Sequence, residues 1–208
     1  MKNQSITEAM LQFIEESPTA FHAAANVEAL LLENGFEKLE NLAEGALVPG
    51  GSYYTMQNGS AVLAVKIPEN PAKGFRIAAS HSDSPCFKIK EVPEMKVENT
   101  YVKLNVEKYG GMILSPWLDR PLSVAGRVFV AGKDGKPEVK LVNLKKDLLI
   151  IPNVAIHFNR EINNGFAYNP QTDMAPLMGL DQELSIKKLC AEAADVAEEE
   201  ILGSDLYV

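Results

Sequence analysis

Two residues near position 80 have the types and the spacing that suit metal binding. His81 and Asp83 lie in the polar run Ser80–Pro85, which follows a short apolar segment. In an extended backbone, residues i and i+2 point to the same face, so this pair can address one point. A metal-binding imidazole is commonly held by a carboxylate that fixes its tautomer and raises its basicity. The bare His-x-Asp pattern is common, however, and spacing alone favours an ordinary hydrogen-bonded pair.

The chain has only three histidines and two cysteines for such chemistry. His157 and Asn159 would share a face if their segment were a strand, yet a structural histidine is the commoner case. His22 lies on the apolar face of a predicted helix and is expected to be structural. Cys86 and Cys190 are expected to pack as small apolar residues rather than act as nucleophiles. The sequence lacks His-Glu-x-x-His, Cys-x-x-Cys, Gly-x-Ser-x-Gly and Walker patterns.

The elements before residue 93 predict a mixed α/β domain with its site at a sheet edge. Ser5 and Glu8 have the spacing of a capping box, which predicts a helix that ends before Pro18. A second helix is predicted from about Thr19 to Asn34. The dipeptide Asn58-Gly59 predicts a hairpin between strands 53–55 and 61–65, and a further strand is predicted over 75–79. Polar residues at the end of that last strand place His81 and Asp83 at the sheet edge.

The remainder of the chain predicts a second, mostly β domain. Strands are expected over 101–106, 122–130, 139–144 and 154–157, with a hairpin turn over 132–137. A helix is predicted over 181–200. Residues 201–208 then begin an apolar strand that is expected to lack sheet partners.

Composition excludes several classes of protein. The 208 residues are 46% apolar and 23% charged, which suits one or two globular domains. A formal charge of −8 argues against nucleic-acid binding. No apolar run is long enough to cross a bilayer, and the N-terminal segment lacks the pattern of a signal peptide. With only two cysteines, the sequence predicts a cytoplasmic protein without a membrane partner.

Five sequence segments match a known family of proteins in the same order along the chain, and the match of all five makes the resemblance specific. They are Ser17–Ala23, Tyr53–Ser60, Ser80–Cys86, Trp117–Arg127 and Ile151–His157. Together they resemble the aspartyl aminopeptidase family of zinc metallopeptidases along nearly the whole chain.

The resemblance implies an α/β fold: a partial zinc-exopeptidase-like catalytic domain with helices and a mixed sheet, interrupted by an inserted β-rich dimerisation domain. The expected divisions are residues 1–93 and residues 94–208, the latter ending where the chain returns to the catalytic domain. The implied enzyme is a two-zinc aminopeptidase that removes N-terminal residues, in the best-known members acidic ones, from peptides; other divalent metals are allowed. Homodimers would build a dodecamer.

The resemblance also implies roles for three residues. His81 corresponds to a zinc ligand, and Asp83 to its catalytic, orienting partner. His157 corresponds to a histidine of the inserted domain that reaches an active site, in a neighbouring subunit, as either a substrate-binding residue or a metal ligand.

The family's later acidic and histidine ligands are absent from these 208 residues. A dinuclear site needs about five protein ligands, and this chain offers one or two. The sequence is therefore expected to be the N-terminal portion of such an enzyme, inactive alone. Two alternatives stay open: a non-catalytic oligomerisation or regulatory subunit of a full-length relative, and an unrelated hydrolase that uses His81 and Asp83 without metal.

Overall fold

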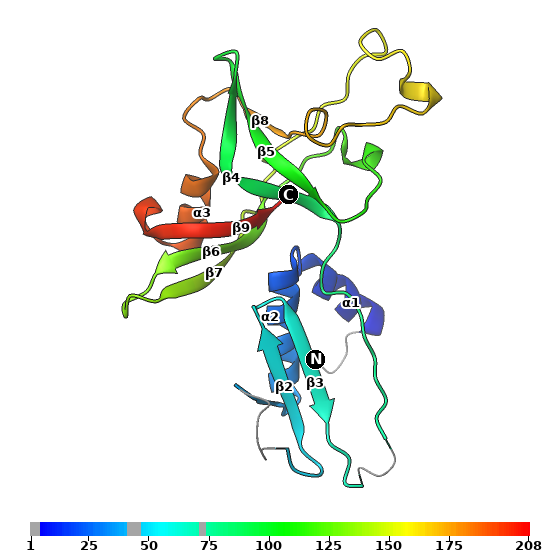
Figure 1. Ribbon diagram of the computed structural model, residues 1–208, viewed down its shortest axis with the longest axis vertical. Helices are drawn as coiled ribbons and strands as arrows, with labels where there is room; N and C mark the ends of the chain where they lie inside the picture. The colour runs from blue at the N-terminus through cyan, green and yellow to red at the C-terminus, as the bar shows by residue number, and fades with distance from the viewer. Residues whose placement is uncertain (1–4, 41–46, 71–73) are drawn as a thin grey trace. The chain divides into compact units, whose positions relative to one another are not determined.

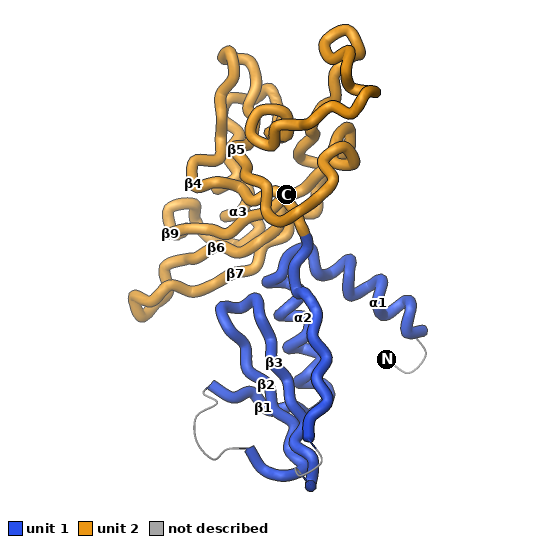
Figure 2. Tube along the Cα trace, turned by 45° about the vertical axis from the view of Figure 1, so that its right-hand side comes forward, with its two compact units in different colours: residues 1–84 blue, residues 85–208 orange. Residues whose placement is uncertain are grey.

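The computed structural model describes residues 5–40, 47–70 and 74–208. The chain forms two compact units, Met1–Ser84 and Pro85–Val208, drawn in blue and orange in Figure 2. The first four residues, which belong to the segment searched for a signal peptide, lie outside the described residues. Within the described ranges, no helix is long and apolar enough to span a membrane.

Two helices begin the first unit, as the sequence predicts. Helix α1, Ile6–Glu15, starts at a complete capping box: Glu8 N donates to Ser5 Oγ at 3.2 Å, and Ser5 N donates to Glu8 Oε2 at 2.9 Å. Helix α2, Ala20–Glu33, is followed by Gly35 at φ +75°. Glycine adopts such a left-handed conformation more readily than any other residue, which favours the end of the helix at this point.

A three-stranded sheet completes the described part of this unit, in the order β1-β2-β3 (Figure 1). The strands are β1, Glu37–Lys38; β2, Ser52–Gln57; and β3, Ala61–Lys66. Strands β2 and β3 form the predicted antiparallel hairpin, with Gln57 paired to Ala61. Its turn is of type I′, because Asn58 and Gly59 have φ values of 54° and 68°.

A polar cluster joins α2 to this sheet. The carboxylate of Glu28 accepts a hydrogen bond from the buried Tyr54 at 2.9 Å and lies 2.8 Å from Lys38 Nζ. The hydrogen bond from Lys38 lowers the pKa of Glu28, whereas burial, helped by Glu28, raises the pKa of Tyr54. The cluster therefore holds the carboxylate ionised against the sheet.

The predicted strand over 75–79 is wrong. These residues form no strand in the described part of the chain, and Phe75 and Ile77 are 66% and 89% exposed. An apolar, extended segment becomes a strand only when another strand accepts its backbone hydrogen bonds. None of the described strands pairs with it.

The second unit is built on a six-stranded sheet in the order β7-β6-β9-β4-β5-β8 (Figure 1). The strands are β4, Cys86–Val97; β5, Tyr101–Tyr109; β6, Ala125–Ala131; β7, Pro137–Asn143; β8, Leu177–Gly179; and β9, Ile201–Tyr207. Helix α3, Ile186–Ala194, covers one face through Ile186 and Cys190, both in the core with Phe87, Leu104 and Val128. Short 3₁₀ helices in this unit include Ser115–Trp117, Ile162–Asn164 and Glu198–Glu200.

The sequence prediction is confirmed for strands β5, β6, β7 and β9 and for the turn over 132–137. Besides the short strand β8, which was not predicted, three other elements correct it. Strand β4 was not predicted, because Pro93 interrupts the pattern; the structure accommodates this proline in a register shift between Ile89 and Glu94. The predicted helix over 181–200 is shorter. It begins at Ile186, whose N–H donates to Glu94 Oε1 at 2.7 Å, and ends at Asp195, in the left-handed region.

The third correction concerns residues 154–157, which are not a strand. Their turn is closed by a 2.8 Å hydrogen bond from Phe158 N to Ala155 O. Just before it, Val154 N donates to Asn153 Oδ1 at 2.9 Å. Such a local side-chain bond competes with strand pairing.

The last strand has partners on both sides, contrary to the expectation that it would lack them. Strand β9 pairs with β6 along most of its length and with β4 through Tyr207 and Lys88. Val208 N also donates to Phe87 O at 2.9 Å. The first and last strands of this unit, β4 and β9, are therefore neighbours in its sheet.

The two cysteines are expected to differ sharply in reactivity. Cys190 is buried in the core, and burial raises the pKa of its thiol to about 12, whereas Cys86 is half-buried. Because the thiolate is the nucleophile, Cys190 should react with a disulfide reagent at about pH 8 at least roughly 100-fold more slowly than Cys86. Stopped-flow labelling should find one reactive thiol in the native chain and two after unfolding. Equal labelling of both native thiols would refute the packing of Cys190.

Candidate metal site

The predicted site residues follow the extended segment that ends unit 1. Residues 80–84 belong to no strand, and the backbone bends at Ser82. They border a hollow of about 550 Å³ whose other walls come from α1, α2 and β3, through residues that include Phe13, Val27 and Val62. The site segment thus lies against the described core of its own unit.

The bend brings the side chains of His81 and Asp83 together. His81 Nδ1 lies 3.0 Å from Asp83 Oδ1. An ionised carboxylate only accepts hydrogen bonds, so Nδ1 donates; in a neutral imidazole Nε2 then keeps its lone pair. The His81 side chain is 93% exposed and that of Asp83 is 32% exposed. An exposed imidazole whose second nitrogen is held by a carboxylate suits a metal ligand.

His81 and Asp83 are too few to form a metal site by themselves. No group of three or more histidine, cysteine, aspartate or glutamate side chains in the described residues is arranged to hold a metal ion. Zinc in proteins takes four or five ligands. His81 Nε2 therefore fits a zinc ion as a single ligand, and the remaining ligands would come from outside the described residues.

His157 lies in unit 2, on an exposed excursion that leaves the sheet after Ile151 (yellow in Figure 1). In a strand, His157 and Asn159 would point to the same face. The segment is a turn instead, so that expectation is wrong. The base of the excursion is firmly held: Asp119 N donates to Ile151 O, and Asp119 Oδ1 accepts from Asn153 N, both at 2.9 Å. The excursion thus has a fixed base, and His157 beyond it is exposed.

The third histidine is structural, as the sequence predicts. His22 is half-buried on α2, and its Nδ1 lies 2.8 Å from Thr19 Oγ1. A residue that the sequence did not single out is Ser82, whose hydroxyl donates to Ser60 O at 2.8 Å. No local pattern connects these two positions, because Ser60 is distant in sequence.

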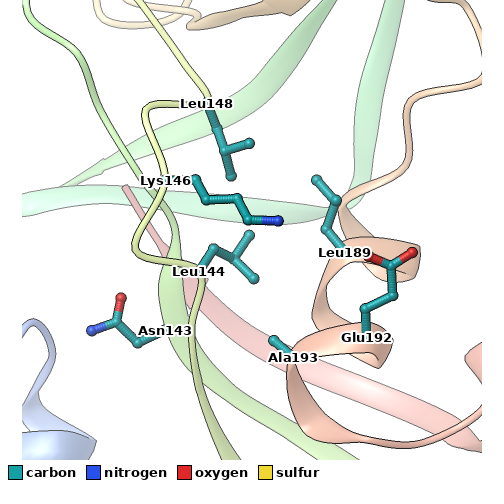
Figure 3. Close-up of a pocket in the computed structure, with 7 residues that line it drawn as sticks. All are labelled: Asn143, Leu144, Lys146, Leu148, Leu189, Glu192 and Ala193. Atoms are coloured by element: carbon teal, nitrogen blue, oxygen red, sulfur yellow. The ribbon is translucent and has the colours of Figure 1, made fainter.

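A second hollow, of about 320 Å³, lies between α3 and the loop after β7 (Figure 3). Lys146 extends into it from the loop, and Leu189 and Glu192 face it from the helix. It contains none of the three predicted site residues.

Comparison with known proteins places this geometry in context. Residues 13–208 match the family model described as aminopeptidase I zinc metalloprotease (M18). The probable M18 family aminopeptidase 2 of Clostridium acetobutylicum is 43% identical over 217 residues, covering 100% of this chain and 50% of the relative. The chain spans about half the length of the curated relatives it matches.

Solved structures have the same fold. A protein chain in the solved structure of the Ape4 and Nbr1 complex matches with a TM-score of 0.87 and 32% identity, and the match covers 96% of the present chain and 42% of that one. The S. cerevisiae mApe1 dodecamer matches with a TM-score of 0.78 and 23% identity, covering 98% of this chain and 47% of that one. At that identity, the second match is informative about the fold alone.

Proposed function

This chain belongs to the M18 family of aminopeptidase I zinc metalloproteases, and from that premise we propose that it carries the first corner of a two-zinc aminopeptidase site. The observation that carries the proposal is the contact between His81 and Asp83, 3.0 Å apart, with Nε2 of an exposed imidazole left to bind metal. The family description as a zinc metalloprotease favours this reading over a metal-free hydrolase.

The two residues have distinct proposed roles. His81 binds one zinc ion through Nε2, and Asp83 fixes the tautomer and raises the basicity of that imidazole. When bound, zinc ions polarise the scissile carbonyl and lower the pKa of a coordinated water. Because the described residues supply one ligand, the chain alone is inactive, and the other ligands and the proton-transferring glutamate come from further sequence.

Exposed apolar surface on unit 1 supports the need for further chain. Phe75 and Ile77 lie on the segment that leads to His81, and Ile6, Met10 and Ile14 on α1 are between 53% and 90% exposed. Large apolar side chains with such high exposed fractions are usually covered where they form a contiguous surface. The described part of unit 1 therefore suits one portion of a larger α/β catalytic domain.

Substrate and assembly follow the family resemblance. The substrates would be peptides with a free N-terminus, acidic residues being preferred. Unit 2 would be the inserted dimerisation domain, which the adjacent positions of Lys88 and Tyr207 support. Homodimers would assemble into dodecamers, and exposed His157 would contact substrate or metal in a neighbouring subunit. The protein would be cytoplasmic.

A second candidate is a non-catalytic subunit that binds a full-length relative through unit 2. One observation favours it: β9 lies between β6 and β4, so the last strand of the sequence already has a partner on each side within unit 2. Co-purification of the 208-residue chain with a full-length M18 protein, without any gain of activity from fusion, would favour this candidate.

The test is a fusion of residues 1–208 to the C-terminal half of the C. acetobutylicum relative. With zinc, cobalt or manganese, the fusion should hydrolyse Glu- or Asp-nitroanilide, and the 208-residue chain should be at least about 10³-fold slower. Circular dichroism would establish that both proteins are folded. Turnover by the chain alone at roughly 1 s⁻¹ or faster would contradict the incomplete site, and a folded but inactive fusion would contradict the aminopeptidase proposal.

A further inference from the structure

The hydroxyl of Ser82 lies between the two proposed site residues and is tied to a different element. Ser82 Oγ donates to Ser60 O at 2.8 Å, while its neighbours His81 and Asp83 contact each other at 3.0 Å. His81 and Asp83 thus contact each other, and Ser82 between them is hydrogen-bonded to the β2–β3 hairpin. This arrangement follows from the bend of the backbone at Ser82.

The acceptor of this hydrogen bond is rigidly placed. Ser60 N donates to Gln57 O at 3.1 Å, which closes the type I′ turn of Asn58 and Gly59. The next pair, Gln57 and Ala61, continues the β2–β3 ladder. Ser60 O therefore has a position set by backbone hydrogen bonds of the sheet.

The segment that needs positioning has no such support of its own. Residues 74–85 form no ladder with the described strands, and the His81 side chain is almost wholly exposed. A pair of exposed side chains keeps one geometry only if its backbone is held, because free rotation would otherwise separate them. The hairpin is the element that can hold it.

We propose that Ser82 is a positioning residue: its hydrogen bond to the β2–β3 turn holds the bend that brings Asp83 onto the imidazole of His81 and directs Nε2 to the metal. This inference rests on the proposed zinc site and adds the group that orients it. The lost bond in Ser82→Ala is a neutral one, so the paired geometry should become about three- to tenfold less populated relative to the unpaired one.

The first readout needs only the zinc-free 208-residue chain. At about pH 8.5, where imidazoles are neutral, ¹⁵N NMR distinguishes a ring protonated on Nδ1 from one protonated on Nε2. His81, assigned by loss of its signals in His81→Ala, should carry its proton on Nδ1. In Ser82→Ala the tautomer ratio should move toward Nε2 by about three- to tenfold, and Ser82→Thr, which keeps the hydroxyl, should restore it.

Ser123→Ala is the matched control. The hydroxyl of Ser123 also bonds to a distant backbone group, accepting from Lys146 N at 3.3 Å, but in unit 2. Its removal should leave the His81 tautomer unchanged. The same variants in the fusion give the second readout: of the Ser82 and Ser123 variants, only Ser82→Ala should bind zinc more weakly, with a dissociation constant about three- to tenfold higher.

The outcomes separate this inference from the proposed function. If His81→Ala lowers the zinc content of the fusion by at least one ion but Ser82→Ala matches the wild type in tautomer ratio, the positioning role is refuted and the site stands. If His81→Ala leaves zinc binding unchanged, the proposed site itself fails. A Ser82→Ala effect that Ser82→Thr does not rescue also overturns the positioning role.

Discussion

Replacing His81 with alanine in the fusion of this chain to the C-terminal half of its C. acetobutylicum relative is expected to lower kcat/KM by about 10³-fold or more. The side chain is 93% exposed and contacts Asp83, so its removal creates no cavity and leaves the core intact. The loss would come from the zinc ion, which contributes several kcal/mol of charge stabilisation in such sites. Steady-state hydrolysis of Glu-nitroanilide measures it.

Two further variants define the mechanism of that loss. Asp83→Asn keeps the shape but removes the charge that fixes the imidazole tautomer, and should cost about 10- to 100-fold in activity. His22→Ala serves as the histidine control, because His22 is half-buried on α2 and bonded to Thr19. Loss of activity in His22→Ala equal to that in His81→Ala would contradict a specific role for His81.

The second large effect concerns the close contact between β6 and β9 in the sheet of unit 2. An ideal Cβ on Gly126 would lie 2.1 Å from Asp205 O and 2.9 Å from Leu206 Cα. Both are backbone atoms of β9, paired directly with β6, so neither strand can move aside without breaking the ladder. Gly126→Ala should therefore destabilise unit 2 by at least about 3 kcal/mol.

Urea denaturation of the 208-residue chain measures this change through the single tryptophan. Trp117 lies in unit 2, with its ring 5.0 Å from that of buried Phe87. Gly203→Ala is the control, because a Cβ on Gly203, also in β9, would meet no atom within 4 Å. Equal midpoints for the two variants would show that the close approach of β6 and β9 does not hold the sheet together.

Elements governed by local chemistry were predictable from the sequence. The capping box of Ser5 and Glu8 and the turn of Asn58 and Gly59 involve residues within three positions of each other, and both form as expected. Local patterns failed where the outcome depends on distant partners. Residues 75–79 have a strand pattern but no strand beside them, and β4 tolerates Pro93 because its register shifts there.

The same distinction applies to the site. The contact of His81 with Asp83 was predictable from their spacing, although a bend rather than a strand brings them together. The bond of Ser82 to Ser60 was not, because only the folded hairpin places that carbonyl near the segment. Likewise, the sequence suggested an unpaired final strand, whereas the fold places β9 between β6 and β4.

The zinc content of the fusion tests the central claim, that His81 is one ligand of a zinc site completed by further sequence. Elemental analysis after dialysis should find about two zinc ions per wild-type fusion chain and at least one fewer in His81→Ala. The 208-residue chain alone should retain less than about one, since the described residues offer a single ligand. Full zinc occupancy in His81→Ala would contradict the account.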